Sequence, residues 1–199
     1  MTRAADSARR LSPDDYLALP LRAHELLRDV PIYDVTVVDL LGGGVGRRIA
    51  DIRRLEAQSP PSVIVRALFG LRLALGRLFG WDRSALRPEE SLRSRLSEKD
   101  RRDSEVAPGS HFGAFLVVYQ FAEEALAETR NSTVHGWVCT ALAPRGSGYR
   151  LYMAVYVRPV SWLTRPYLLL IEPFRRFLVY PAMLRRIRRA WIAAYGAAA

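Results

Sequence analysis

The fold is decided by residues 149–191, which read YRLYMAVYVRPVSWLTRPYLLLIEPFRRFLVYPAMLRRIRRAW. Residues 149–157 are rich in β-branched and aromatic side chains and contain no Gly or Pro, a composition that predicts a strand. Arg158-Pro159 closes this strand, because proline cannot donate a hydrogen bond to a neighbouring strand. From about Trp162, apolar residues recur every three or four positions, which predicts a long helix with one apolar stripe. The members of the stripe are Leu170, Phe174, Phe177, Pro181, Leu184, Ile187 and Trp191.

Four further strands are predicted at residues 33–41, 115–121, 124–130 and 133–143. Short or turn-rich segments join the last three to one another and to residues 149–157, which indicates an antiparallel meander. Helices are predicted between the first strand and this meander, at 47–57 and 61–79. This order of elements predicts an α+β fold in which a curved antiparallel sheet packs against the long C-terminal helix.

The length of 199 residues predicts a single domain. We expect residues 1–12 to be a flexible N-terminal tail and residues 13–199 to form that domain. Residues 82–110 are dense in Arg, Glu, Asp and Ser, and a polar excursion of this length is typical of a lid, a binding loop or a mobile insertion. The segment GGGVG, residues 42–46, lacks the spacing of a dinucleotide loop and predicts a plain turn or bulge.

The chain carries a formal charge of +10, and Lys99 is the only lysine among its 30 basic residues. Positive charge favours anionic partners such as phospholipid or acidic ligands. Nucleic acid is not expected, because acidic residues interleave with the basic ones in residues 82–110 and no aromatic side chain there could stack on bases. The single cysteine, Cys139, excludes an intramolecular disulfide framework and fits a reducing cytoplasm. Without a secretory signal or an apolar run of about 20 residues, we expect a soluble, cytoplasmic protein.

Alternation places candidate site residues on shared strand faces, because residues two apart in a strand point the same way. His135 shares a face with Trp137 and Cys139. The same rule groups Tyr152 with Tyr156 on the next strand, and Glu124, Leu126, Glu128 and Arg130 on an earlier one. If these faces coincide, they line a cavity with apolar walls and a few polar groups, as ligand sites commonly do. The alternative for His135 is a structural hydrogen bond within the sheet.

Few catalytic patterns are present. His135 and Cys139 do not form a thiol–imidazole pair, since residues four apart on a strand lie ~13 Å apart. No metal-ligand spacing, nucleophile elbow or P-loop occurs, and no cofactor is expected. An enzyme would have to rely on a general acid or base in a shaped pocket. Arg72 lies at the edge of a helical apolar stripe and needs an acceptor, which is either a structural ion pair or an acidic ligand.

The order of elements resembles the START-like superfamily, also termed SRPBCC or polyketide cyclase/dehydrase and lipid-transport-like, which has a helix-grip fold. The segments NSTVHGWVCTAL (131–142), LFGLRLALGRLFGWD (68–82) and residues 149–191 look like bacterial families of unknown function near that superfamily. The resemblance runs from about His24 to Trp191 and is most specific at Glu172-Pro173-Phe174-Arg175 and Tyr180-Pro181. Arg175 stands where related sequences carry His, so no role of that histidine is carried over.

The resemblance implies a cavity between the sheet and the C-terminal helix for a hydrophobic or amphipathic small molecule, lipid or polyketide-like. We expect wall residues Tyr119, Trp137, Tyr152 and Tyr156, polar anchors His135 and Arg72, and a lid at 82–110. The alternative is a cyclase or dehydratase-type enzyme with His135 or Glu128 as general acid or base. A third possibility is a peripheral module that meets anionic membranes through Arg185, Arg186, Arg188 and Arg189. The oligomeric state stays open.

Overall fold

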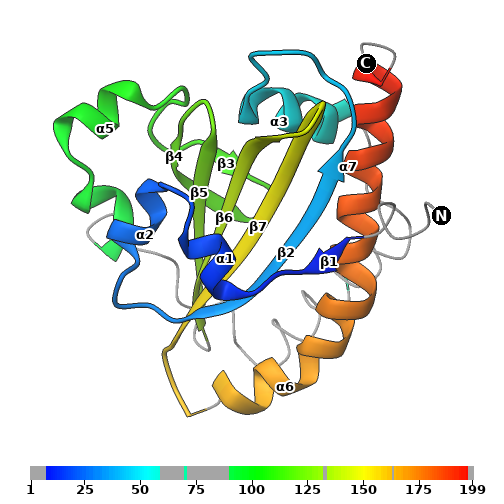
Figure 1. Cartoon of the computed structure of the whole chain (residues 1–199). Coiled ribbons are helices and arrows are strands. Elements are labelled where there is room, and N and C mark those ends of the chain that lie inside the picture. Colours follow the sequence, from blue (N-terminus) through cyan, green and yellow to red (C-terminus); the bar gives the residue numbers. More distant parts are fainter. Residues whose placement is uncertain (1–7, 59–69, 71–89, 132–133, 163, 197–199) are drawn as a thin grey trace.

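The computed structural model describes residues 8–58, 70, 90–131, 134–162 and 164–196, without the side chains of residues 165, 167, 170 and 171. Within these residues the core is one antiparallel sheet of seven strands in the order β1-β2-β7-β6-β5-β4-β3 (Figure 1). The predicted α+β class, with its antiparallel sheet and C-terminal helix, is confirmed. The strands are β1 Arg9–Arg10, β2 Ile32–Leu40, β3 His111–Phe112, β4 Phe115–Gln120, β5 Glu124–Arg130, β6 Val134–Arg145 and β7 Gly148–Pro159.

The helices divide between the two faces of this sheet. They are α1 Pro13–Leu17, α2 Arg22–Leu26, α3 Ile49–Gln58, the 3₁₀ turn η4 Leu92–Arg95, α5 Glu98–Asp103, α6 Thr164–Phe174, the π-helical η5 Arg175–Val179 and α7 Tyr180–Tyr195. In Figure 1, α1 and α2 lie in front of the strands, whereas α7 runs along the side of β2. The predicted helix at 61–79 lies outside the described residues, apart from Gly70.

One face of the sheet packs against α1, α2 and η4, and is termed the α2 face. Its core joins side chains of the sheet to those helices, because alternate residues of β5, β6 and β7 all point to this side. The buried members are Tyr16, Ala23, Leu27, Val30, Val35, Leu92, Leu96, Val118, Tyr119, Leu126, Trp137, Cys139, Ala154 and Tyr156. The aromatic strand residues singled out from the sequence therefore belong to the α2 face.

The other face packs against α3 and α7, and is termed the α7 face. Leu184, Ile187 and Trp191 of α7 are buried there against the intervening strand residues, such as Leu151 and Met153. The Trp191 indole also donates a hydrogen bond of 3.1 Å to the backbone oxygen of Leu41. The predicted C-terminal helix thus lies on the sheet, as its apolar stripe requires.

The apolar stripe of the C-terminal helix is not continuous, which corrects the prediction. Phe174 and Phe177 are 44% and 67% exposed, whereas Leu184 is fully buried. The reason is the π-helical turn η5, whose extra residue shifts the phase of the helix between the two halves of the stripe.

Two segments expected to be loose are held in the fold. Arg9 and Arg10 pair with β2 as a short strand, and Arg10 forms an ion pair of 2.8 Å with buried Asp34, so the N-terminal tail is shorter than predicted. In the expected lid, residues 91–96 pack on the α2 face through buried Leu92 and Leu96, whereas no residue of α5 is buried. Residues 82–89 lie outside the described part of the chain.

Candidate functional site

Two rows of side chains cross the α2 face near one end of the sheet. In the first row, His135 on β6 pairs with Arg130 on β5 and with Arg158 on β7. In the second row, Trp137 pairs with Glu128 and with Tyr156 in the same way. Antiparallel partners that are directly opposite have neighbouring side chains on one face. The strand faces that the sequence grouped separately therefore coincide.

Glu128 lies at the centre of a buried hydrogen-bond network. Its carboxylate is completely inaccessible to solvent and accepts hydrogen bonds from the Ser91 hydroxyl, from the Leu92 backbone N–H at 3.2 Å and from the Trp137 indole at 3.1 Å. His135 Nε2 lies 3.4 Å from the same Glu128 Oε2. A buried carboxylate needs such donors in place of water. The network ties the start of η4 to the middle of the sheet.

His135 is held between this carboxylate and an aromatic neighbour. Its ring stacks on Trp137 with a centroid distance of 3.9 Å and an interplanar angle of 29°. The Arg158 guanidinium lies 5.8 Å from the centroid of the Trp137 ring, within the range of a cation–π contact. The stack leaves about a tenth of the His135 side chain exposed, so the imidazole is fixed in position yet reachable.

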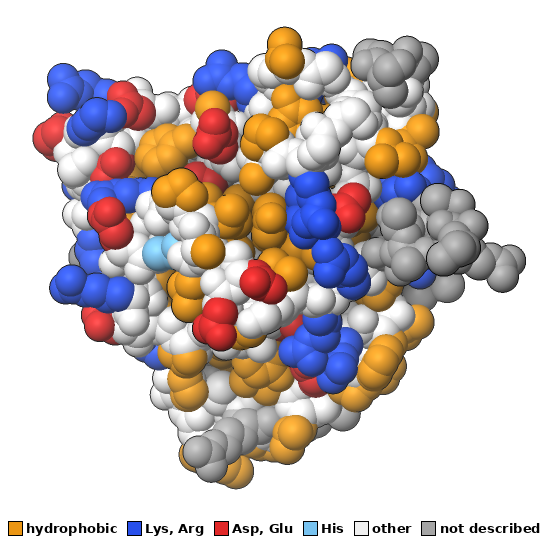
Figure 2. Space-filling model, viewed as in Figure 1, with side chains coloured by type: hydrophobic (Ala, Val, Ile, Leu, Met, Phe, Trp, Pro, Cys, Tyr) orange, Lys and Arg blue, Asp and Glu red, His pale blue; other side chains and the backbone are white. Residues whose placement is uncertain are grey.

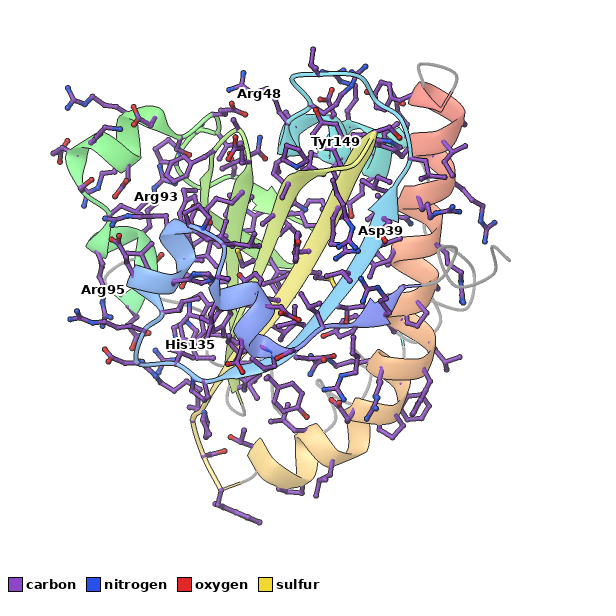
Figure 3. The ribbon with its side chains drawn as sticks, in the orientation of Figure 1. Asp39, Arg48, Arg93, Arg95, His135 and Tyr149 are labelled. Atoms are coloured by element: carbon purple, nitrogen blue, oxygen red, sulfur yellow. The ribbon has the colours of Figure 1, made fainter. Side chains whose placement is uncertain are left out.

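A hollow of about 150 Å³ opens above this stack. Its floor is His135 and Trp137, and its wall is the end of α2 with the following turn. Its charged side chains come from that turn, from the η4 segment, from β5 and from β7. The lining residues are Leu26, Leu27, Asp29, Val30, Glu90, Leu92, Arg95, Arg130, His135, Trp137 and Arg158. Figure 3 shows Arg95 and His135 on the α2 side of the molecule, away from Asp39 and Tyr149.

A second, more apolar hollow of about 300 Å³ adjoins the first. Leu27 and Val30 line both, so the turn after α2 separates them. The remaining lining residues are Pro13, Leu17, His24, Arg28, Ile32 and Tyr156. The two hollows lie on either side of Leu27 and Val30, and we term the pair the furrow along α2; it is polar at the Arg95 end and apolar at the Pro13 end.

The predicted site residues fall into three groups. His135 and Trp137 line the first hollow, Tyr156 lines the second, and Glu128 lies beneath the floor. Tyr119 and Tyr152 pack into the core instead, Tyr119 stacking on Phe121 at 4.4 Å and Tyr152 packing beside Tyr16. Arg72 lies outside the described residues.

The cavity expected between the sheet and the C-terminal helix is not where these residues lie, which corrects that prediction. His135, Trp137, Tyr152 and Tyr156 all face α1 and α2, whereas α7 covers the opposite side. The physical reason is the pleat: Leu151, Met153 and Val155 alternate with the tyrosines of β7 and supply the surface on which α7 packs.

The sequence pattern groups Arg130 with Glu128 on one strand face but assigns no role in a site to Arg158, Arg95 or Ser91. Arg158 lies two residues beyond Tyr156, and Arg130 two beyond Glu128, so alternation alone places both on the α2 face. Arg95 and Ser91 come from a segment without regular periodicity, and only the packing of η4 brings them to the sheet. The Arg93 guanidinium, which donates to the backbone oxygen of Val118 at 3.0 Å, helps to fix η4 there.

The interior beneath α1 and α2 contains titratable groups that stay protonated. Burial raises the pKa of the Cys139 thiol to about 12 and raises the pKa values of Tyr16, Tyr119 and Tyr156 well above the ordinary value for tyrosine. Tyr156 and Tyr16 approach each other with their hydroxyl oxygens 3.5 Å apart. Cys139 is therefore a packed thiol and not a nucleophile at neutral pH.

The described part of the chain contains neither a cluster of metal ligands nor a membrane-spanning helix. No group of three His, Cys, Asp or Glu side chains there is placed to hold a metal ion. No helix among those residues combines the length and the apolar character needed to cross a bilayer.

The fold and the site define an α+β protein whose antiparallel sheet carries a small charged pocket on one face and a long C-terminal helix on the other. Residues 26–182 match the model of a family described as "Protein of unknown function (DUF2867)", and the chain belongs to that family. The comparisons with curated proteins and with solved structures gave no match.

Proposed function

We propose that the protein binds a small amphipathic molecule in the furrow along α2, with the anionic group of the ligand at Arg95, Arg130 and Arg158. The observation that carries this proposal is the first hollow, where three guanidinium groups surround a floor of stacked His135 and Trp137. Guanidinium groups match carboxylate and phosphate geometry, and an aromatic floor accepts a flat or apolar group beside them.

The charges of the hollow favour an anion. Its lining includes three arginines and two carboxylates, Asp29 and Glu90. Glu90 pairs with Arg130 at 2.6 Å, whereas Arg95 and Arg158 are exposed at the rim. An anionic group entering the hollow therefore meets two accessible guanidiniums.

The volumes of the two hollows limit the size of the ligand. A hollow of about 150 Å³ holds a group no larger than a benzene-sized molecule. The apolar remainder of a lipid or polyketide-like ligand would extend past Leu27 and Val30 into the second hollow, beside Leu17, Ile32 and Tyr156. A molecule with one anionic end and one apolar end fits both parts.

Binding of matched probes tests this proposal. Decanoate and decanol share one alkyl chain and differ in charge, and acetate carries the charge without the chain. Calorimetric titration is expected to give tighter binding for decanoate than for either. Arg95→Gln or Arg158→Gln removes one charge-assisted hydrogen bond and should lower the affinity for decanoate about tenfold or more. Leu17→Asp should lower the affinity for decanoate but not for acetate.

Arg54→Gln provides the matched control, because Arg54 is an exposed arginine of α3 on the far side of the sheet. Equal binding of decanoate and decanol, or unchanged affinity in Arg95→Gln and Arg158→Gln, would refute the proposal. If the probes bind as expected, native mass spectrometry of the protein mixed with cell extract identifies the natural ligand.

The contact between His135 and Glu128 favours a second candidate, an acid–base enzyme of cyclase or dehydratase type that uses the same pocket. Glu128 is inaccessible and would orient the imidazole, while His135 lines the hollow and would exchange a proton with the ligand. His135→Gln should then abolish turnover of the substrate. The affinity for decanoate should stay within about threefold of the wild type, because the arginines that meet its carboxylate are unchanged.

We also propose a distant relationship to the START-like superfamily. It is supported by the order of strand, helices, antiparallel strands and long C-terminal helix packed on the sheet. The furrow along α2 lies on the opposite face from the helix-grip cavity that the resemblance implies, so the binding proposal rests on the pocket residues alone.

A further inference from the structure

The segment around α6 exposes large apolar side chains to solvent. Trp162, in the loop before α6, is 82% exposed, Leu169 of α6 is 76% exposed and Phe177 of η5 is 67% exposed. Val160, Phe174 and Leu178 in the same segment are also exposed. This loop and α6 form the lower tip of the molecule in Figure 1, and Figure 2 shows hydrophobic side chains along that edge. We term Trp162, Leu169, Phe174, Phe177 and Leu178 the α6 tip.

The charge of the same part of the chain is strongly positive. Residues 158–199 carry eight arginines and one acidic residue, Glu172. Arg185 and Arg189 are exposed on α7, four residues apart and therefore on the same side of that helix, and Phe174 and Leu178 are exposed at the preceding turns. Arg176 is exposed beside Phe177. Exposed arginines thus border the apolar side chains.

Arg186 and Arg188, the other two arginines expected to meet a membrane, turn toward the protein. The Arg188 guanidinium donates to the backbone oxygen of Asp39 at 3.3 Å. The Nε of Arg186 is buried, and its charge acts on Glu56 of α3, whose pKa it helps to lower against the dominant raising effect of burial. Arg185 and Arg189 therefore remain as the exposed pair.

We propose that the α6 tip docks on the surface of an anionic lipid bilayer. An exposed Trp with neighbouring Leu and Phe suits the boundary between head groups and acyl chains, where an indole has both an apolar and a polar environment. Arg176, Arg185 and Arg189 would meet the phosphate and carboxylate groups of acidic lipids. A tip that projects from the fold can enter a deformable surface without a complementary partner.

Vesicle co-sedimentation of the full chain tests the proposal. Vesicles of phosphatidylcholine alone are compared with vesicles that also contain phosphatidylserine. Binding is expected only to the anionic vesicles and should weaken as the salt concentration rises. Arg185→Gln with Arg189→Gln should lower the partition coefficient about 30-fold, the equivalent of about 1 kcal/mol for each arginine.

Apolar contacts are tested separately by Leu169→Asp with Phe177→Asp, which should abolish binding. Both side chains are exposed, so the fold does not depend on them, and a circular dichroism spectrum checks this. Val45→Asp is the matched control, because Val45 is a 98% exposed apolar residue in the loop between β2 and α3. Its binding should equal that of the wild type.

Tryptophan fluorescence gives a second readout. Trp162 is exposed whereas Trp137 and Trp191 are buried. In a Trp81→Phe background, vesicles should shift the emission to shorter wavelength, and Trp162→Phe should remove this shift. Equal binding to neutral vesicles, or binding that survives Leu169→Asp with Phe177→Asp, would overturn the proposal. So would a dimer in sedimentation velocity that these substitutions dissociate without any vesicle binding, since the occupant would then be a second copy.

Discussion

Trp137 and Glu128 stand directly opposite each other on β6 and β5, and the indole Nε1 donates to the Glu128 carboxylate at 3.1 Å. The same carboxylate accepts from Ser91 and Leu92 at the start of η4. One buried anion therefore joins the sheet, the floor of the pocket and the segment that carries Arg95. The position of the pocket floor and the stability of the fold are therefore linked through this group.

Replacing the central carboxylate should destabilise the protein. Glu128→Gln removes one of two accepting oxygens and places an amide NH₂ beside groups that already donate. We expect the free energy of unfolding to fall by about 3 kcal/mol, the scale for an unsatisfied buried polar group bonded to a charge. Urea unfolding measures it. Glu98→Gln, at an exposed position of α5, is the control and should change stability by less than about 0.5 kcal/mol; an equal effect of the two would contradict this role of Glu128.

Glu124 should make stability depend on pH. Burial raises the pKa of its carboxyl above the ordinary value, although the backbone N–H groups of Arg22 and Ala23 counteract part of that rise. A group whose pKa is raised on folding stabilises the native state fully below the unfolded-state pKa of about 4.3. This contribution is lost as pH rises through the folded-state pKa, because the unfolded chain releases its proton first.

The expected result is a difference between variants. From pH 4 upward, the wild type should lose stability relative to Glu124→Gln, which cannot titrate. Denaturant unfolding at a series of pH values measures this difference. Glu123→Gln changes the exposed neighbouring position, and its free energy of unfolding should vary with pH in parallel with that of the wild type. A stability difference between Glu124→Gln and the wild type that stays constant with pH would rule out the linkage.

Cys139 should be unreactive in the folded protein. Its side chain is fully buried, and burial raises its pKa to about 12, so almost no thiolate is present at neutral pH. Dithiobisnitrobenzoate should label the thiol only as fast as the protein opens, and immediately in concentrated urea. The destabilised Glu128→Gln variant should label faster. Stoichiometric labelling of the native wild type within seconds would show that Cys139 is accessible.

Gly43 should tolerate a side chain less well than its neighbour Gly44. Both have positive φ, of 103° and 64°, so alanine is strained at each by about 1 kcal/mol. A Cβ at Gly43 would also lie 2.6 Å from Cζ2 of buried Trp191, whereas at Gly44 no atom is within 4 Å. Gly43→Ala should therefore cost about 1–3 kcal/mol more than Gly44→Ala in thermal or urea unfolding. Equal losses would mean that the Trp191 ring moves without cost. The GGGVG segment belongs to the loop between β2 and α3, and Gly42 and Gly43 lie against the end of α7.

The positions of five of the seven strands could be predicted from the sequence, whereas the two-residue strands β1 and β3 are too short to leave a pattern. Composition and alternation placed five strands to within about two residues at each end, and β5 was placed without error, because these signals are local and the meander joints are short. Part of the candidate site followed from the same rule. His135, Trp137, Tyr156 and Glu128 share one face because side chains alternate along every strand.

The rest of the site depends on contacts between distant parts of the chain. Ser91 reaches Glu128 across 37 positions, and η4, which carries Arg95, has no periodicity that marks it as part of a pocket. The shift of phase at η5 likewise arises within a helix that reads as continuous, so the exposure of Phe177 could not be predicted from spacing.

The sequence by itself determined the strands, the class of fold and which side chains share a face, since the period of a strand is a property of neighbouring residues. Only the tertiary structure decided which helices cover each face. β2 pairs with β7, where Asp39 meets Arg150 over 111 positions, and α7 packs on one side of the sheet while α1, α2 and η4 pack on the other. Both faces of the central strands are apolar, so either could have received the C-terminal helix on hydrophobicity alone. The paths of the connections settle the choice, and with it the position of the pocket.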